Sequence, residues 1–587
     1  MQGIYGAVLV VNLSEKTHRI EHPEEEVYRQ YLGGKGLASW LLQESNPARV
    51  DPLGPENSLI FATGPVTGSP VWGGCRYGVY TKSPQTGFYA ESYSGGKVPE
   101  AMDSTGYDAI VFQGRSAEPL VVEIHPGEVV FHEAGDLWGR ETYDTEEEVV
   151  KRFSRSDWDF GRAGSVVIGP AAENLVRFGV IKNDHWRSAG RTGVGTVLGA
   201  KKVKAVVFQG NRKRPLFDSS AVRDLAGRIA RSGRDNPGVL AYKSMGTSQL
   251  VKIVNNANAF PTRYWSEGRF EHWEKISAEA LHSRCEVKPN ACLKCFMACG
   301  RRTTIREGRH AGLRLEGPEY ETIYAFGGLC LIDSIEEIAY LNDLCDRLGL
   351  DTITAGNLCA FTMEASRRRA IAHHLEYGDA DGAAELLRMI AQRQGLGNVL
   401  AEGIVAAAKA WGLEDVAVHV KGLEPAGYDP RVLKGMGLAY ATSDRGACHL
   451  RATFYKPELT RMIDPAEIKG KAELFLDFED RLTVFDTLIF CRFYRDLYTW
   501  DVLSEIVRAV TGLEADKKFL QQRAADISTL VRRFNIREGL TRKDDWLPPR
   551  LLSRMSQTGN ELKAEELEFM LQDYYRLRGW NQEGVLV

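Results

Sequence analysis

The chain has little cysteine, almost no charge excess and no long apolar run. Its ten cysteines among 587 residues are too few for a disulfide framework. The formal net charge is −4, from 74 basic and 78 acidic side chains, which gives no electrostatic case for nucleic acid or a membrane surface. No stretch is apolar over the length of a bilayer, and the first 20 residues lack a basic leader with an apolar core. We expect a cytoplasmic protein in a reducing compartment, with no nucleic-acid partner and no membrane insertion.

The length allows about three domains, each with its own core. We expect an α/β (α+β) fold: a β-rich domain over residues 1–210, followed by two mainly helical domains over 211–420 and 421–587. In the first range, short strands are bounded by Gly and Pro. They read AVLVVNLSEKTHRIEH, SLIFATG, RYGVYTK, DAIVFQG, PLVVEIHPGEVVFHEAG and SVVIG.

One strand sequence occurs twice in the β-rich part. DAIVFQG at 108–114 returns as KAVVFQG at 204–210, and each ends a stretch that runs from a Gly-rich segment through a short helical segment. This echo predicts two related halves packed against each other. Coincidence between short apolar runs is the alternative.

Beyond residue 215, apolar residues recur at spacings of three and four. The segment FDSSAVRDLAGRIARSG reads as a helix capped by Asp218. The segments IEEIAYLNDLCDRLG, GAAELLRMIAQRQG and VLAEGIVAAAKAWG read as helices that each stop at Gly. RLTVFDTLIFCRF (481–493) is apolar on nearly all faces and predicts a buried helix that carries Cys491. AEELEFMLQDYYRLRGW predicts a last helix.

Four cysteines have the spacing of an iron–sulfur site. Cys292, Cys295 and Cys299 form a C-x2-C-x3-C run, and Cys491 lies far downstream. Three thiolates on a tight loop with one distant thiolate suit a [4Fe–4S] cluster. Zinc, which more often takes two separated pairs, and unliganded thiols are the alternatives. The radical-SAM loop has the opposite order of spacings. A cluster would make electron transfer part of the function.

Two hexapeptides share a D-x-x-x-x-(D/C) pattern: Asp346 to Asp351, DRLGLD, and Asp486 to Cys491, DTLIFC. Their carboxylates could accept hydrogen bonds from the edge of an amino-pterin ring. A helix cap is the structural alternative for such a motif. The run GVGTVLG at 193–199 lacks both the glycine spacing and the downstream acid of a nicotinamide site.

Taken together, these motifs resemble the tungsten-dependent aldehyde ferredoxin oxidoreductase family over nearly the whole chain. That family has C-x2-C-x3-C, two D-x-x-G-L-(C/D) motifs and a distal cysteine in the second motif, which reads I-F in place of G-L here. Further similar stretches are GGCRYGVYTKSPQTG, RSAGRTGVGTVLGAKKVKAV, EGPEYET, KGLEPAGYDPR and ATSDRGACHLRA.

The resemblance implies a tungsten or molybdenum ion held by the dithiolene sulfurs of two pyranopterins, which the β-rich domain cradles. It further implies a Mg²⁺ ion bridging the pterin phosphates, a small aldehyde substrate, and electron transfer to ferredoxin or an iron–sulfur subunit. Cys292, Cys295, Cys299 and Cys491 would hold the cluster. The implied cofactor-binding residues are Arg76, Gly95, Arg187, Ser188, Gly190, Asp346, Leu350, Asp351, Arg445, Arg451, Asp486 and Phe490.

The resemblance also implies a catalytic histidine and glutamate beside the metal. His449 would donate to the metal oxo group or the substrate carbonyl, against the alternative of a core histidine. Glu319 or Glu321 would act as general base, and the sequence does not choose between them. Glu316 is expected at the surface.

One departure from the family bears on assembly, and other reactions remain as alternatives. No E-x-x-H motif occurs around 340–343, so we expect an oligomer without the bridging metal of some members. Reduction of an aromatic acyl-CoA of the benzoyl-CoA type, or reduction of acids, would use the same cofactors. A cluster-bearing electron-transfer subunit with no catalytic metal is the alternative from another class.

Overall fold

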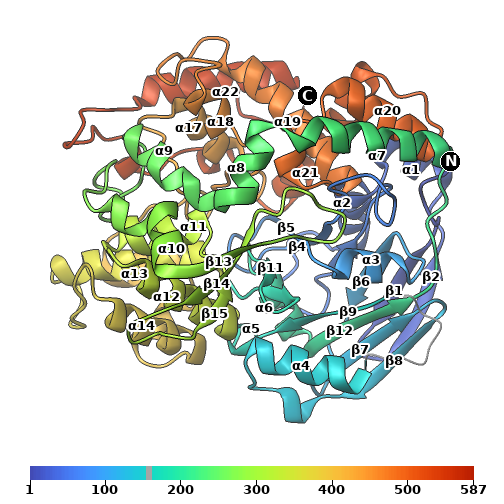
Figure 1. Cartoon of the computed structure of the whole chain (residues 1–587), viewed down its shortest axis with the longest axis horizontal. Helices are drawn as coiled ribbons and strands as arrows, with labels where there is room; N and C mark the ends of the chain where they lie inside the picture. The colour runs from blue at the N-terminus through green and yellow to red at the C-terminus, as the bar shows by residue number, and fades with distance from the viewer. Residues whose placement is uncertain (154–161, 587) are drawn as a thin grey trace.

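Two six-stranded sheets form the first third of the chain, at the lower right of Figure 1. The computed structural model describes residues 1–153 and 162–586. In spatial order, the first sheet contains β2 (Thr17–Glu21), β1 (Val8–Asn12), β6 (Ala109–Gln113), β3 (Leu59–Ala62), β4 (Tyr77–Lys82) and β5 (Tyr89–Ser94). The second contains β8 (Glu128–Glu133), β7 (Leu120–His125), β12 (Val203–Gly210), β9 (Arg162–Ile168), β10 (Ile181–Asn183) and β11 (Arg187–Ala189).

The two sheets have the same topology. In each, the strand that carries the echoed sequence, β6 or β12, pairs parallel to a hairpin strand, β1 or β7. On its other side it pairs antiparallel to the first strand of a meander, β3 or β9. The prediction of two related halves is confirmed.

The halves pack through a shared apolar core. Residues from both sheets belong to one buried cluster, and the rings of Phe61 and Phe208 lie 6.2 Å apart across it. Strands that are buried on both faces need an outer cover. Helices α2 (Gly34–Ser45) and α21 (Lys517–Arg537) cover the first sheet, and α4 (Thr142–Phe153) covers the second.

The rest of the chain is mainly helical, as expected, and occupies the left and top of Figure 1. Residues on both sides of position 420, such as Leu344, Leu386, Leu438 and Phe475, share one core. The other α-helices in the described residues are α1 (Glu25–Tyr31), α3 (Val98–Asp103), α5 (Pro170–Glu173), α6 (Val194–Ala200), α7 (Ser219–Arg234), α8 (Pro237–Met245), α9 (Leu250–Asn256), α10 (Ala278–Arg284), α11 (Tyr320–Thr322), α12 (Ile335–Leu348), α13 (Thr352–Arg367), α14 (Ala380–Gln392), α15 (Leu396–Leu400), α16 (Ile404–Trp411), α17 (Lys434–Thr442), α18 (Tyr455–Leu459), α19 (Lys471–Leu488), α20 (Trp500–Thr511) and α22 (Ala564–Arg578).

Capping residues and glycine stops in the sequence predicted most of the expected helix ends correctly. Asp218 caps α7 by accepting from the amides of Ser220 and Ala221, at 3.0 and 2.9 Å. Gly349 and Gly412 end α12 and α16 in the left-handed conformation. The expected stop at Gly395 is wrong, because α14 already ends at Gln392 with Arg393 left-handed.

A small sheet interrupts the helical part and was not expected from the sequence. It consists of β13 (Cys285–Asn290), β14 (Gly300–Ile305) and β15 (Arg314–Glu316). The loop between its first two strands carries the three clustered cysteines.

The placement of Cys491 on a helix is wrong. Helix α19 is buried as predicted, but it ends at Leu488, where Ile489 turns left-handed at φ 68°. Cys491 follows in extended conformation and precedes the short 3₁₀ helix η5 (Arg492–Tyr494). Because Cys491 lies beyond the end of the helix, helical geometry does not set the direction of its thiol, which can face a neighbouring loop.

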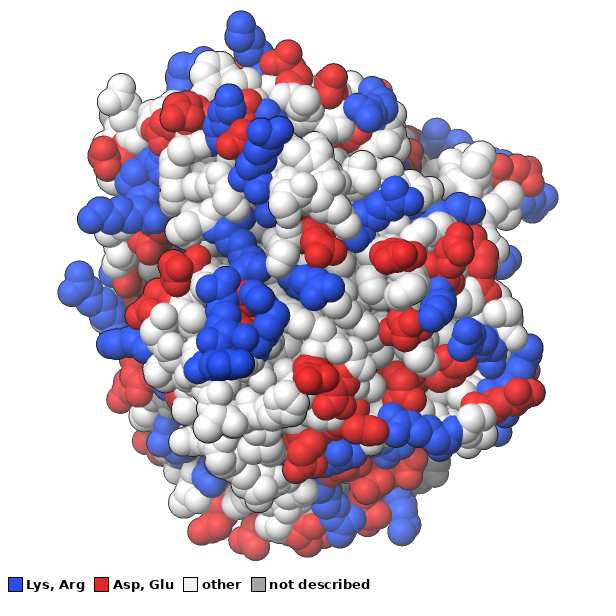
Figure 2. Space-filling model, turned by 90° about the vertical axis from the view of Figure 1, so that its left-hand side faces the viewer, with Lys and Arg blue, Asp and Glu red and all other residues white. Residues whose placement is uncertain are grey.

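No helix in the described part of the chain combines the length and apolarity that crossing a bilayer requires. Acidic and basic side chains are interspersed over the face drawn in Figure 2, in keeping with the small net charge.

Candidate functional site

Backbone hydrogen bonds join the loop of the three clustered cysteines to the segment that carries Cys491 and to two loops of the β-rich part. The amide of Cys491 donates to the carbonyl of Gly73 at 2.8 Å, and the amide of Gly73 donates to the carbonyl of Lys294 at 3.2 Å. The amide of Leu293 donates to the carbonyl of Gly96 at 3.3 Å. The C-x2-C-x3-C loop is therefore held between the first half of the β-rich part and the segment after α19.

The four predicted cysteines face a common region. Burial raises the pKa of the Cys299 thiol well above its usual value, and Glu319, Cys491 and Cys295 are close enough to add to the rise. Arg76 Nη2 lies 3.5 Å from Cys491 Sγ. The hydroxyl of Tyr494 lies 3.5 Å from Cys295 Sγ.

The absence of a side chain at Gly95 leaves space for the thiol of Cys292. A Cβ atom on Gly95 would lie 2.7 Å from Cys292 Sγ, closer than real side chains approach. The sequence analysis missed a fifth cysteine here: Cys75 is 3% exposed, and the thiols of Cys292 and Cys295 beside it, together with burial, raise its pKa. Its only sequence signal was its place in GGCRYG.

The four cysteines are the donor set to compare with a metal site. In the described ranges, no three His, Cys, Asp or Glu side chains converge closely enough to hold a single metal ion. Cys299 is close enough to Cys295 and Cys491, and Cys295 to Cys292, for their charges to act on one another. A [4Fe–4S] cluster takes four such neighbouring thiolates as its ligands.

Two adjoining cavities extend from the cysteines. The central cavity, of 330 Å³, reaches Cys491, and the second, of 310 Å³, reaches Cys292 and Cys299. The residues that line both are Arg76, Ser188, Gly190, Glu319, Glu321, Ile353 and Phe493.

Most of the predicted cofactor-binding residues line these cavities. Arg445 lines the central cavity alone, and five line only the second: Gly95, Arg187, Asp346, Leu350 and Asp351. Arg451, Asp486 and Phe490 line neither in the described chain. The structure thus brings nine of the twelve to the cavity walls: Arg76, Gly95, Arg187, Ser188, Gly190, Asp346, Leu350, Asp351 and Arg445.

The first hexapeptide joins two helices at the wall of the second cavity. Asp346 lies in the last turn of α12 and pairs with Lys182 of β10. Asp351 caps α13 by accepting from the amides of Ile353 and Thr354, at 3.2 and 3.4 Å. The capping interpretation and the cavity-lining interpretation therefore both hold for Asp351.

The second hexapeptide behaves differently. Asp486 is 1% exposed and pairs with Arg451 at 3.0 Å and with Arg492. Phe490 packs its ring against Tyr498 and Phe485, at 4.8 and 5.6 Å. These contacts give Asp486 an ion-pairing role and Phe490 a place in the core.

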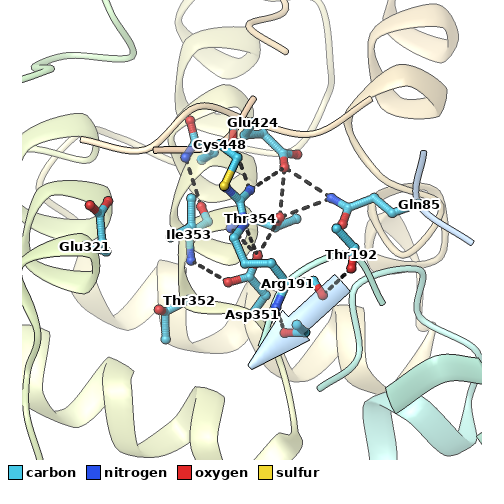
Figure 3. A network of polar contacts seen from close by, with 12 residues as sticks. Gln85, Arg191, Thr192, Glu321, Asp351, Thr352, Ile353, Thr354, Glu424 and Cys448 are labelled. Atoms are coloured by element: carbon cyan, nitrogen blue, oxygen red, sulfur yellow. Dashed lines mark hydrogen bonds and ion pairs between the residues drawn. The ribbon is translucent and has the colours of Figure 1, made fainter. Parts of the chain in front are cut away.

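Arg191 lies at the centre of a buried network that the sequence analysis missed (Figure 3). Its Nε lies 3.2 Å from Asp351 Oδ2, and its Nη2 donates to the carbonyl of Glu424 at 2.8 Å. Gln85 and Thr354 donate to the Glu424 carboxylate at 3.2 and 2.8 Å. Glu321 stands apart from these contacts in the same view. Arg191 lies inside the quoted RSAGRTG stretch, which was the available signal.

His449 and Glu321 meet at the central cavity. His449 Nε2 lies 3.5 Å from Glu321 Oε1, and the amide of Gly427 donates to Glu321 Oε2 at 3.0 Å. Burial raises the pKa of Glu321 to about 7. Burial, with Arg191, Arg445 and Arg492 nearby, lowers the pKa of His449 well below its usual value, so the ring is neutral.

The two candidate glutamates have different surroundings. Glu319 Oε2 accepts from the hydroxyl of Thr247, and its buried carboxyl is close to Cys299. Glu321 Oε1 is buried with no hydrogen-bond partner and lies beside His449. The surface position expected for Glu316 is wrong: it is 8% exposed and pairs with Arg187 at 2.8 Å.

Positive charge is concentrated around the central cavity. Arg76, Arg191, Arg445, Arg492 and Arg495 line it, against the two carboxylates Glu319 and Glu321. Buried unpartnered atoms include His449 Nδ1 and the Nε atoms of Arg492 and Arg495. Buried polar groups normally have partners, so this lining fits a large anionic group better than an empty space.

Comparison with known proteins gives a consistent result. The family profile described as aldehyde ferredoxin oxidoreductase, N-terminal domain, matches residues 8–210, and that for domains 2 and 3 matches residues 224–587. The tungsten-containing aldehyde ferredoxin oxidoreductases of Thermococcus kodakarensis and Pyrococcus furiosus are 36% and 34% identical, over 100% of this chain and 97% of each relative. The fold matches that of the BamBC active-site complex of benzoyl-coenzyme A reductase with 1,5-dienoyl-CoA. Its TM-score is 0.87 at 24% identity, over 100% of this chain and 96% of that one.

Proposed function

This chain belongs to the aldehyde ferredoxin oxidoreductase family of oxidoreductases, and we propose that it oxidises aldehydes to carboxylic acids. An aldehyde and water give a carboxylate, three protons and two electrons. The electrons pass singly through a [4Fe–4S] cluster to ferredoxin or an iron–sulfur subunit. In the described residues, no disulfide joins any of the ten cysteines, which supports a reducing, cytoplasmic setting.

The lining of the two cavities supports a bis-pyranopterin cofactor of tungsten or molybdenum. When bound, this cofactor supplies the two-electron acceptor for the aldehyde. Asp346, Leu350 and Asp351 would hold one pterin, and Arg76, Arg187 and Arg445 would face phosphates and their Mg²⁺ ion. Asp486 would act through Arg451 and Arg492.

Cluster binding is assigned to Cys292, Cys295, Cys299 and Cys491. Arg76 would donate to the sulfur of Cys491, and Tyr494 to that of Cys295, as their 3.5 Å separations suggest. Hydrogen bonds to cluster sulfurs raise the reduction potential by stabilising the more negative, reduced state.

Glu321 would act as the general base, and His449 would act as a hydrogen-bond donor. Glu321, with its free Oε1, would take a proton from the water that attacks the carbonyl carbon. Neutral His449 would donate a hydrogen bond to the carbonyl oxygen as negative charge develops there. Glu319, tied to Thr247 on the cysteine side, would position the loop that carries Cys299.

One observation carries the proposal: a single cavity is lined by the His449–Glu321 pair and by Cys491. The acid–base groups and an iron ligand thus share one space, which gives electrons a short route away from the substrate. Any oligomer would form without a metal-bridging E-x-x-H motif.

The test is anaerobic purification followed by metal analysis and turnover with short and aromatic aldehydes. Four irons and one tungsten or molybdenum per chain, with aldehyde-dependent reduction of ferredoxin, are expected. Active protein that contains iron alone would rule the proposal out. Benzoyl-CoA in the same panel separates aldehyde oxidation from acyl-CoA ring reduction.

A further inference from the structure

Arg495 is a buried cation at the wall of the central cavity. It follows η5 in the chain, is 2% exposed, and lines the cavity together with Tyr428, Tyr455 and Phe493. Neither the hexapeptide motifs nor the stretches similar to the family include it.

The other arginines of this cavity each have an acidic or sulfur partner. Arg76 faces Cys491 Sγ at 3.5 Å, and Arg445 Nη2 donates to Cys448 Sγ at 2.9 Å. Arg191 pairs with Asp351, and Arg492 pairs with Asp486.

Arg495 is the exception among these arginines. Its Nη1 donates to the carbonyl of Arg492 at 3.0 Å and its guanidinium donates to the hydroxyl of Tyr242, while its Nε is buried without a hydrogen-bond partner. Asp496, next in the chain, pairs with Lys456 instead. Within the described ranges no carboxylate lies within ion-pair distance of Arg495. A buried guanidinium without an anion is costly, so its retention points to an anion that arrives from elsewhere.

The surroundings of Arg495 hold charges of both signs: Asp496 attracts its guanidinium, and two further cations lie close by. Burial and the neighbouring charge of Arg495 both lower the pKa of Lys456. Arg481, whose pKa burial lowers, is also close to Arg495. The three cations Arg495, Lys456 and Arg481 outnumber the two carboxylates beside them, Asp496 and Asp477, so this end of the cavity favours an anion.

An aromatic wall joins this end of the cavity to the proposed catalytic pair. The rings of Tyr428 and Tyr455 stack 4.0 Å apart at an angle of 5°. The ring of His449 lies 5.8 Å from Tyr428 and 6.3 Å from Tyr455, and Tyr455 is also close to Arg495. A substrate could place its aldehyde at His449, its apolar stem on the tyrosines and a charged end at Arg495.

We propose that Arg495 binds an anionic group of the substrate, so that the preferred substrates are aldehydes that carry a second, negatively charged group. The inference rests on the proposed aldehyde oxidation and names its substrate class. For a carboxylate-bearing substrate, the aldehyde and water give a dicarboxylate, three protons and two electrons, and two oxidised ferredoxins accept the electrons. Carboxylate, phosphate and sulfonate share the acceptor oxygens that a guanidinium recognises.

The experiment compares matched aldehydes on the metal-loaded enzyme. Butanal is paired with succinic semialdehyde, benzaldehyde with 4-carboxybenzaldehyde, glyceraldehyde with its 3-phosphate, and propanal with sulfoacetaldehyde. We expect kcat/KM at least about tenfold higher for the anionic member of one or more pairs, and the favoured pair identifies the anionic group.

Arg495→Met should lower kcat/KM for the favoured anionic aldehyde about 100-fold, mainly through KM. Neutral aldehydes should change less than about threefold, and iron and tungsten or molybdenum contents should stay the same. Arg495→Lys, which keeps the charge without the planar fork, should fall in between. Arg461→Met removes a side chain that is 74% exposed and is the matched control.

The outcomes separate the two proposals. Failure to oxidise any aldehyde of the panel would overturn the proposed function. Turnover of neutral aldehydes without preference for an anionic partner would overturn only the role of Arg495. Equal losses on both members of a pair, or loss of metal in the Met variant, would show instead that Arg495 holds the cofactor or stabilises the fold. Butyrate should inhibit the unaltered enzyme more strongly than the neutral butyramide, and equal inhibition by the two would overturn the anion site.

Discussion

His449 Nε2 lies 3.5 Å from Glu321 Oε1, and both side chains line the central cavity. The amide of Gly427 holds the other carboxylate oxygen at 3.0 Å, which leaves Oε1 turned to the histidine. The pair comes from segments 128 residues apart, the start of α11 and the turn after α17. It combines a carboxyl whose pKa is about 7 with a neutral imidazole, as general acid–base chemistry near neutral pH requires.

The pKa of Glu321 predicts how the rate depends on pH. A base must be deprotonated, so kcat/KM should fall about tenfold per pH unit below about 7 and level off above it. Glu321→Gln should lose about 10²–10⁴ in turnover and the acidic limb of the profile. Glu307→Gln, at an exposed position, is the control. If kcat/KM of Glu321→Gln still fell below about pH 7 in the same way, Glu321 would be excluded as the base.

His449 should matter for chemistry and not for assembly. His449→Ala should lose about 10²–10³ in turnover, the usual cost of one preorganised donor, with iron, tungsten and pterin retained. His449→Asn or Gln, which keeps a neutral donor, should recover part of the rate. Metal content and thermal unfolding are measured beside turnover, with His374→Ala, 80% exposed, as control. Loss of cofactor in step with activity would instead identify a structural histidine.

Gly95 should be required for iron binding. An alanine Cβ there would lie 2.7 Å from Cys292 Sγ, so the cysteine loop would have to shift. Gly95→Ala should lower the iron content per chain and weaken the cluster absorbance. Gly135→Ala, whose Cβ would meet nothing within 4 Å, should bind iron normally. Full iron occupancy in Gly95→Ala would show that Cys292 can move without loss of the cluster.

A buried ion-pair network around Asp545 should carry much of the stability of the helical part. Asp545 lies 2.8 Å from both Lys421 Nζ and Arg532 Nη1, and its side chain is fully buried. Asp545→Ala leaves both cations unpaired and should lower the free energy of unfolding by about 3–5 kcal/mol in denaturant titrations. Asp381→Ala, whose side chain is 74% exposed in a pair with Arg309, should cost less than about 1 kcal/mol.

The same network predicts a loss of stability in acid. Burial opposes ionisation of Asp545, but Lys421 and Arg532 outweigh it and lower its pKa. A lowered folded-state pKa stabilises the fold above the unfolded value of about 4, and this stability is lost as pH falls through the folded value. Asp545→Ala should therefore flatten the acid limb of the stability curve. An unchanged acid limb in that variant would assign the pH dependence to other carboxylates.

Local signals account for what could be predicted of the fold. The Asp218 cap, the Gly349 stop and the echo of β6 in β12 depend on residues that are neighbours in the chain or on a repeated strand. The end of α19 at Leu488 could not be predicted, because a β-branched residue seldom takes the left-handed turn that Ile489 adopts. Packing of that segment against Gly73 decides the turn, and no local pattern encodes it.

The sequence by itself determined the family, the cysteine spacing of a cluster and the order of the two acidic hexapeptides. It also placed His449 and two glutamates among the candidates. Only the tertiary structure gave Glu321 and Glu319 different surroundings, placed Arg191 and Cys75 at the site and Phe490 in the core, and left Arg495 without an ion pair among the described residues. The reason is physical. Spacing and capping act over a few residues, whereas the burial, the pKa and the charge balance of a side chain depend on neighbours that come from hundreds of residues away in the sequence.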